Sequence, residues 1–179
     1  MSRLLAAVLG FGLVGAQAQP REAAADPASP WGQAGREARR LTGSAQALLP
    51  GLLDLAQRSR KAGFKSGEID EALWQLARDL HQTHADLQAL GLRTQRLERV
   101  RSQEGPQAAT DLLQASSALR QAAAALQDGA QRAFREDLQP QGFTHQGWNI
   151  KREAKQALKA AVQVEQSCGR LAQRVRVLP

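Results

Sequence analysis

The residues in this sequence whose types and spacing could best form a chemical site are two histidines. His81 and His84 stand in the segment DLHQTHADL. Residues three apart on a helix lie about 60° apart around its axis, so both imidazoles can reach one metal ion. Asp79 and Asp86 each lie two positions from the nearer histidine and therefore point toward another face. The pair predicts two ligands of a metal site.

A metal site here needs a third ligand, and that ligand has to come from another helix. Glu165 and His145 are the candidates that the sequence offers. The alternative is a solvated pair, since His84 only flanks the apolar stripe of its helix and His81 lies outside it. Covalent haem attachment is not predicted, because the chain has a single cysteine and lacks the Cys-x-x-Cys-His motif. No cofactor is predicted.

Four smaller side chains lie on the apolar stripes. Cys168 is the only cysteine, so it forms no disulfide within the chain, and its position predicts a small buried hydrophobe. Thr83, Thr94 and Ser116 place hydroxyl groups where apolar residues would otherwise stand. Buried hydroxyls need hydrogen-bond partners. They either line a narrow pocket for a small ligand or bond to carbonyls of their own helices.

Basic residues are the second group that could bind a partner. The chain has 24 lysine and arginine residues against 17 aspartate and glutamate residues, a formal net charge of +7. This balance favours anionic partners such as lipid headgroups, cell-wall polymers or nucleic acid, although the charge can also serve solubility alone. The candidate anion-binding residues are Arg93, Arg96, Lys151, Arg152, Lys155 and Lys159. The last four lie on a basic amphipathic helix, which allows peripheral contact with a membrane, or else they form a solvated outer face.

The composition predicts that these residues are carried by helices. Ala, Leu and Gln make up 80 of the 179 residues, whereas Val, Ile and Thr supply 14, which leaves little material for a sheet. Apolar residues recur every three or four positions along four stretches, 31–55, 69–97, 109–133 and 150–178. This period is that of an amphipathic helix. Each stretch therefore predicts one long helix.

Four such stripes are buried most economically against one another. We therefore predict an all-α fold, an antiparallel up-down-up-down four-helix bundle with helices of about 30 residues each. Pro50 lies inside the first stripe, so we expect a kink or break near residues 46–51. The last connection is expected at 138–149. The competing architecture is a pair of long hairpins that complete the bundle as a homodimer.

The aromatic residues of the last connection could mediate contact with a partner. Phe143, His145 and Trp148 stand close together in the sequence. They could form an exposed contact patch, and they could equally cap one end of the bundle. The sequence leaves both interpretations open.

The first residues have the order of a secretory signal. Arg3 is followed by an apolar run, Leu4 to Val14, and then by the small-x-small site Ala16-Gln17-Ala18. The run is too short for a membrane span. We therefore expect a signal peptide at 1–18 that is cleaved, a flexible leader at 19–30 and a single helical domain at 31–179.

Three glycines in this run also match the G-x-G-x-x-G spacing of a dinucleotide-binding turn. Gly10, Gly12 and Gly15 follow an apolar stretch, but prolines at 20, 27 and 30 prevent the crossover helix that such a site requires. A signal peptide accounts for the segment better. Its glycines are then not part of the folded domain.

Export and the missing motifs together define the expected function. The sequence has no G-x-S-x-G, Walker, H-E-x-x-H or EF-hand motif, so we predict a protein that is not an enzyme. We expect an exported protein, periplasmic or secreted, that binds a protein partner or an anionic envelope component through its basic helix faces. Export makes nucleic acid an unlikely partner. The alternative is a bundle that holds a metal, haem or small ligand through His81 and His84 or through its hydroxyl groups.

Overall fold

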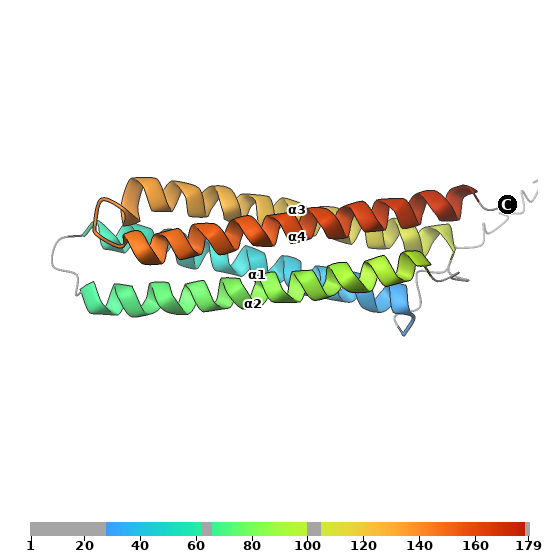
Figure 1. The fold of residues 1–179 in the computed structure, drawn as a ribbon, viewed down its shortest axis with the longest axis horizontal. Helices are drawn as coiled ribbons and strands as arrows, with labels where there is room; N and C mark the ends of the chain where they lie inside the picture. Colours follow the sequence, from blue (N-terminus) through green and yellow to red (C-terminus); the bar gives the residue numbers. More distant parts are fainter. Residues whose placement is uncertain (1–27, 62–65, 100–104, 178–179) are drawn as a thin grey trace, which may run out of the picture.

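The described part of the protein forms four long helices (Figure 1) and one short π-helical segment. A computed structural model describes residues 28–61, 66–99 and 105–177. The elements are α1 Pro30–Ser59, α2 Ser66–Arg99, α3 Pro106–Ala133, the π-helical segment η1 Phe134–Leu138 and α4 Thr144–Val177. Within the described ranges there is no strand. The prediction of an all-α four-helix bundle is confirmed.

The four helices form a square in cross-section. α1 packs against α2 and α3, and α4 packs against the same two helices, whereas the pairs α1 with α4 and α2 with α3 are diagonal, with no Cα atoms within 8 Å of each other in the described ranges. The colours in Figure 1 show that α1 and α3 run in one direction and α2 and α4 in the other. Consecutive helices are therefore antiparallel, as predicted, while α2 and α4 are parallel neighbours. One chain supplies all four helices of the bundle.

The predicted stripes meet along the bundle axis. Leu41, Leu87 and Leu119 are fully buried in one half of the core, and Leu52 and Leu126 are fully buried in the other half. Alanines fill much of the space between these leucines. Small residues let helices approach closely, and leucines fill the remaining volume. The core is therefore a continuous set of alanine and leucine contacts that fixes how the helices are placed.

α1 begins with a capped first turn and then runs unbroken past an internal proline. The hydroxyl oxygen of Ser29 accepts a hydrogen bond from the backbone N–H of Gly32 at 2.9 Å, and Pro30 occupies the first helical position. This cap supplies an acceptor to an N–H group that has no partner within the helix. The helix then runs through Pro50 to Ser59 as one element. Pro50 therefore does not break the helix.

The connection before α4 is shorter than the sequence predicted. We expected a connection over 138–149, but η1 reaches Leu138 and α4 begins at Thr144. The chain turns at Gly142, whose φ of 86° favours glycine, and the N–H of Phe143 donates to the carbonyl of Leu138 at 2.9 Å. Gly147, which falls within the expected connection, lies inside the helix, where it packs against Phe134.

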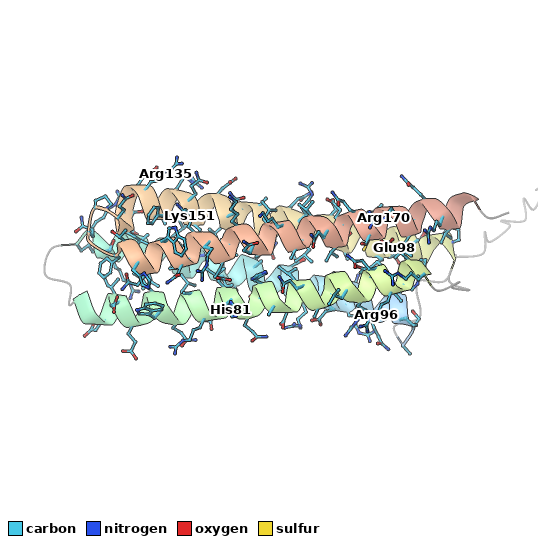
Figure 2. The ribbon with its side chains drawn as sticks, viewed as in Figure 1. His81, Arg96, Glu98, Arg135, Lys151 and Arg170 are labelled. Carbon is cyan, nitrogen blue, oxygen red and sulfur yellow. The ribbon has the colours of Figure 1, made fainter. Side chains whose placement is uncertain are left out.

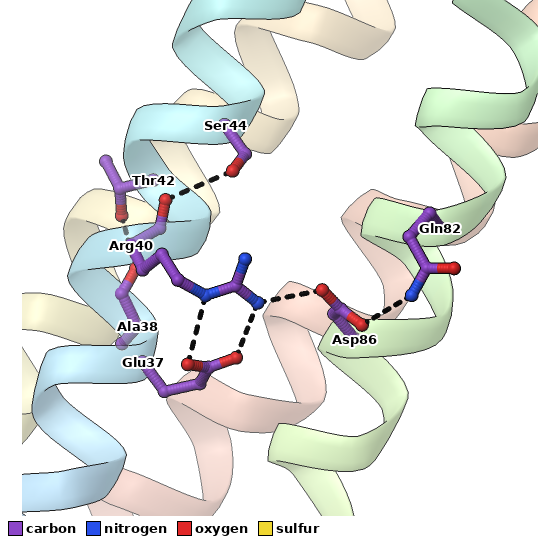
Figure 3. A network of polar contacts seen from close by, with 7 residues as sticks. All are labelled: Glu37, Ala38, Arg40, Thr42, Ser44, Gln82 and Asp86. Carbon is purple, nitrogen blue, oxygen red and sulfur yellow. Dashed lines mark hydrogen bonds and ion pairs between the residues drawn. The ribbon is translucent and has the colours of Figure 1, made fainter.

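Arg40 connects α1 to α2 on the bundle surface (Figure 3). Its guanidinium binds both carboxylate oxygens of Glu37, at 3.1 and 2.7 Å, and an oxygen of Asp86 on α2 at 2.8 Å. Gln82 donates a further hydrogen bond to Asp86 at 2.8 Å. The hydrogen bonds from Arg40 hold the pKa values of both carboxyl groups below their ordinary values. This network adds a polar contact between α1 and α2.

The predicted signal peptide at 1–18 lies outside the described residues, as does most of the leader at 19–30. Within the described ranges, no helix combines the length and the apolar character that a membrane span requires. The described bundle therefore begins at the end of the expected leader, where Ser29 caps α1.

Gly147→Ala and Gly169→Ala should change stability in opposite directions, although both remove a glycine from α4. A Cβ at 147 would lie 2.7 Å from the Phe134 ring and 3.2 Å from the Cβ of Leu138, so we expect a loss of about 1–3 kcal/mol. At 169 a Cβ meets nothing within 4 Å, and we expect a gain of about 0.5–1 kcal/mol. Urea unfolding of both variants measures the effects. Equal effects would contradict this packing of η1 against α4.

Arg40→Gln should destabilise the protein at neutral pH by no more than about 1 kcal/mol, because the pairs are solvent-exposed. Glu37 and Asp86 have lowered pKa values, so their contribution is present at neutral pH and is lost as the pH falls through those values. The difference from the wild type should therefore shrink in acid, in unfolding measured across pH. Arg39→Gln removes the same charge outside this network, and its effect should not follow this pH dependence.

Candidate functional site

The structure brings His81 and His84 together with a carboxylate that the sequence analysis did not name. α2 carries both histidines, and α4 supplies Glu153. The Nδ1 atom of each histidine lies 3.2 Å from the same oxygen, Oε2 of Glu153. The potential ligand atoms of the three residues all lie within 4.8 Å of one another. We call these three residues the His–His–Glu cluster.

The two residues that the sequence offered as a third metal ligand lie elsewhere. Glu165 forms an ion pair with Arg120 of α3 at 2.6 Å. The ring of His145 lies beside that of Trp74, with 5.4 Å between the ring centroids. Neither belongs to the group of potential ligands around Glu153. The choice of Glu165 or His145 as the third ligand was therefore wrong, because residue type alone does not say which helix position faces α2.

Glu153 is a buried carboxylate with three partners. Its side chain is 8% exposed, whereas that of His84 is 14% exposed and that of His81 is 70% exposed. Arg152 donates to its other oxygen, Oε1, from Nε at 3.0 Å and from Nη2 at 2.9 Å. Burial raises the pKa of Glu153, but the hydrogen bonds from Arg152 and both histidines outweigh burial and lower it overall. The cluster thus holds an ionised carboxylate between one guanidinium and two imidazoles.

The parallel packing of α2 and α4 explains why these residues meet. His84 directly follows a stripe residue on α2, and Glu153 directly precedes one on α4. Such flanking positions face each other across the seam between two parallel helices. Two heptads further along, Glu98 and Ser167 occupy the equivalent positions, and Arg170 donates a hydrogen bond to each of them, at 2.9 and 3.1 Å. The signal for Glu153 was therefore present in the sequence, but it required knowing that α2 and α4 are neighbours.

Four of the predicted anion-binding residues line one groove. This groove has a volume of about 460 Å³ and lies between α3 and α4; its lining residues are Gln127, Gln131, Trp148, Lys151, Arg152, Lys155, Gln156 and Lys159. The lining contains four cations and no carboxylate. We call it the basic groove. The sequence pattern on the last helix therefore corresponds to one continuous feature of the surface.

The lysines of the basic groove differ in how they are held. Lys151 places its Nζ 4.4 Å from the centre of the Phe134 ring, which is a cation–π contact. Lys155 and Lys159 are exposed, and their side chains form no hydrogen bond or ion pair in the described part of the chain. Arg152 lies 4.9 Å from the centre of the Trp148 ring. The two exposed lysines are therefore the cations most available to a ligand.

The other two predicted anion-binding residues do not join this groove. Arg96 lies near the end of α2, and Figure 2 shows it at the opposite end of the bundle from Lys151. Arg93 lines a separate hollow between α1 and α2 that also contains the Glu37 carboxylate. The six predicted residues therefore do not form a single surface. Arg93 and Arg96 stand near the end of α2 and the other four in the first half of α4, and these two helices run in the same direction.

The hydroxyl groups on the stripes bond within their own helices. Thr83 donates to the carbonyl of Asp79 at 2.9 Å, and Thr94 donates to that of Gly91 at 3.0 Å. Ser116 likewise donates to the carbonyl of Leu113 at 2.8 Å. The sequence left open whether these hydroxyls line a ligand pocket or bond to carbonyls of their own helices. The structure shows the hydrogen bond within the helix for all three.

Cys168 is fully buried, as expected for a small hydrophobe on the stripe. Burial raises the pKa of its thiol to about 11, even though a hydrogen bond with Ser116 lowers it in part. The thiolate is the nucleophilic form of cysteine, so a raised pKa disfavours covalent catalysis. Cys168 therefore contributes to packing.

The three aromatic residues near the start of α4 have different surroundings. Phe143 is half-buried and packs against the core. His145 contacts Trp74, and Trp148 lies in the basic groove, where it is 46% exposed. One of the three thus caps the core, and another belongs to a candidate binding site.

Two features of the bundle combine polar groups in a way that suits a ligand, the His–His–Glu cluster and the basic groove. They lie on different sides of α4, toward α2 and toward α3 respectively. No family model, curated protein or solved structure matches this chain.

Proposed function

We propose that this protein is an exported, non-enzymatic helical bundle that binds an anionic polymer of the cell envelope in its basic groove. The observation that supports this function is the lining of that groove, which has four cations and no carboxylate. Electrostatic attraction to such a groove concentrates anionic ligands near the surface. The net charge of +7 acts in the same direction over a longer range.

The spacing of the lysines favours an extended ligand. Lys151, Lys155 and Lys159 are four residues apart, so each step along α4 advances the row by about 6 Å. A row of point charges in a concave strip matches a chain that carries negative charges at regular intervals. A flat membrane surface fits a concave groove less well. Among envelope components, the groove therefore favours a polymer over lipid headgroups.

The other lining residues suit an acidic glycan. Gln127, Gln131 and Gln156 offer amides that both donate and accept hydrogen bonds, as sugar hydroxyls require. Trp148 presents a large exposed ring at the same groove, and an aromatic ring can pack against the apolar face of a sugar. We therefore infer that the ligand is a polysaccharide with carboxylate or phosphate groups.

Lys155→Gln combined with Lys159→Gln should weaken binding to polygalacturonate by about tenfold or more, because the variant loses the two available cations of the groove. Titration calorimetry on the full chain at low salt measures this change. The affinity of the wild type should fall as salt is added, and it should fall less steeply for the variant. Circular dichroism should show the same helix content in both proteins.

Arg132→Gln combined with Arg135→Gln is the matched control. It removes the same net charge from a hollow outside the basic groove, where Asp128 and Glu136 balance the two arginines. Its binding should stay close to that of the wild type. Equal losses in both double variants would show that only net charge matters and would contradict a groove site. Binding to phosphatidylglycerol vesicles but not to polygalacturonate would contradict the polymer ligand.

The export part of the proposal rests on the expected signal peptide at 1–18. Cleavage after Ala18 should give a mature protein that begins at Gln19. Intact-mass and N-terminal analysis of the protein purified from its native host measures this end. Retention of Met1 on the native protein would contradict export by cleavage.

A further inference from the structure

We propose that the His–His–Glu cluster is a binding site for a divalent transition metal ion of the zinc class, held by His81, His84 and Glu153 at the seam between α2 and α4. The site is separate from the basic groove and does not depend on the proposed polymer binding. Its ligands come from two helices whose relative position is fixed by the core. The metal would therefore tie α2 to α4.

The distances within the cluster suit a tetrahedral ion. Zinc bonds of about 2.0–2.1 Å in tetrahedral geometry place neighbouring ligand atoms about 3.3–3.4 Å apart. The Nδ1 atoms of His81 and His84 each lie 3.2 Å from Oε2 of Glu153. These separations are at the long end for a hydrogen bond but close to those of an occupied site. All the potential ligand atoms lie within 4.8 Å of one another, so side-chain movements that draw the two histidines together would complete the spacing of a tetrahedral ion.

The ligand types select the class of metal. Two imidazole nitrogens and one carboxylate oxygen suit zinc, copper, nickel and cobalt, whereas magnesium and calcium prefer a set of oxygen ligands. A single buried carboxylate also supplies too few oxygen atoms for a calcium site. The cluster therefore favours an ion that binds imidazole.

The surroundings orient the ligands before an ion arrives. Arg152 donates twice to Oε1 of Glu153, which leaves Oε2 facing the two histidines. Such outer hydrogen bonds fix the direction of a ligating carboxylate. Glu153 and His84 lie in the seam, while His81 is 70% exposed and gives an ion access from solvent. With three protein ligands, a tetrahedral ion keeps a fourth position for water.

Zinc chloride titrated into the full-length chain, purified without a polyhistidine tag and treated with a chelator, should bind with one equivalent per chain. His81→Ala, His84→Ala and Glu153→Gln should each weaken this binding by at least about tenfold. His145→Ala is the matched control, since it removes the third histidine of the chain from a place outside the cluster. It should bind zinc as the wild type does.

Thermal unfolding separates loss of binding from loss of fold. Zinc should raise the melting temperature of the wild type and of His145→Ala, because an ion that binds only the folded state stabilises it. His81→Ala removes a mostly exposed side chain, so its melting temperature without zinc should stay near that of the wild type, and zinc should not raise it.

Three results would overturn this site. The first is that the wild type does not bind zinc. The second is that His81→Ala or Glu153→Gln still binds zinc as the wild type does. The third is that His145→Ala loses as much binding as the variants of the cluster. The polymer titration reports on the lysines of α4 instead, so either proposal can fail while the other stands.

Discussion

The burial of four apolar stripes against one another is the interaction on which the rest of this structure depends. None of the stripes can be covered by its own helix, and a single cysteine provides no disulfide within the chain. Leu80 and Leu87 on α2 are fully buried, and they belong to the two halves of the core that meet near Thr83. The His–His–Glu cluster lies beside this meeting point. Its geometry is therefore a consequence of the register that the leucines and alanines set.

Glu153 also requires this alignment of α2 with α4, because it is a polar group in a buried place. A buried carboxylate without partners is costly, and it is tolerated when charged or hydrogen-bonding groups surround it. Arg152 is its chain neighbour and accompanies it in any register, whereas His81 and His84 reach it only in this alignment of α2 with α4. A shift of one heptad would move the carboxylate about 10 Å along α2. The polar cluster and the apolar core therefore favour the same alignment.

Periodicity predicted the helices and much of the buried surface, because the spacing of apolar residues alone determines which face of a helix is hydrophobic. It did not predict which helices are neighbours, since all four stripes have the same period. Glu153 lies 69 residues from His84 and was missed for that reason, while Glu165 and His145 were chosen by residue type. The lysines of the basic groove were found because their spacing is local to one helix. The predicted last connection was too long, because a glycine in the sequence does not distinguish a turn from close packing inside a helix, as at Gly147.

Arg152 links the two candidate sites. Arg152 holds Glu153 of the His–His–Glu cluster, and the same guanidinium lies over Trp148 in the lining of the basic groove. An ion bound at the cluster would withdraw electron density from the carboxylate of Glu153 and weaken its hydrogen bonds with Arg152. The guanidinium would then be more available to an anion in the basic groove. The positive charge of the ion would also favour the binding of an anion in the basic groove. If both sites bind as proposed, each ligand must strengthen the binding of the other by the same factor, because coupling between two sites is reciprocal.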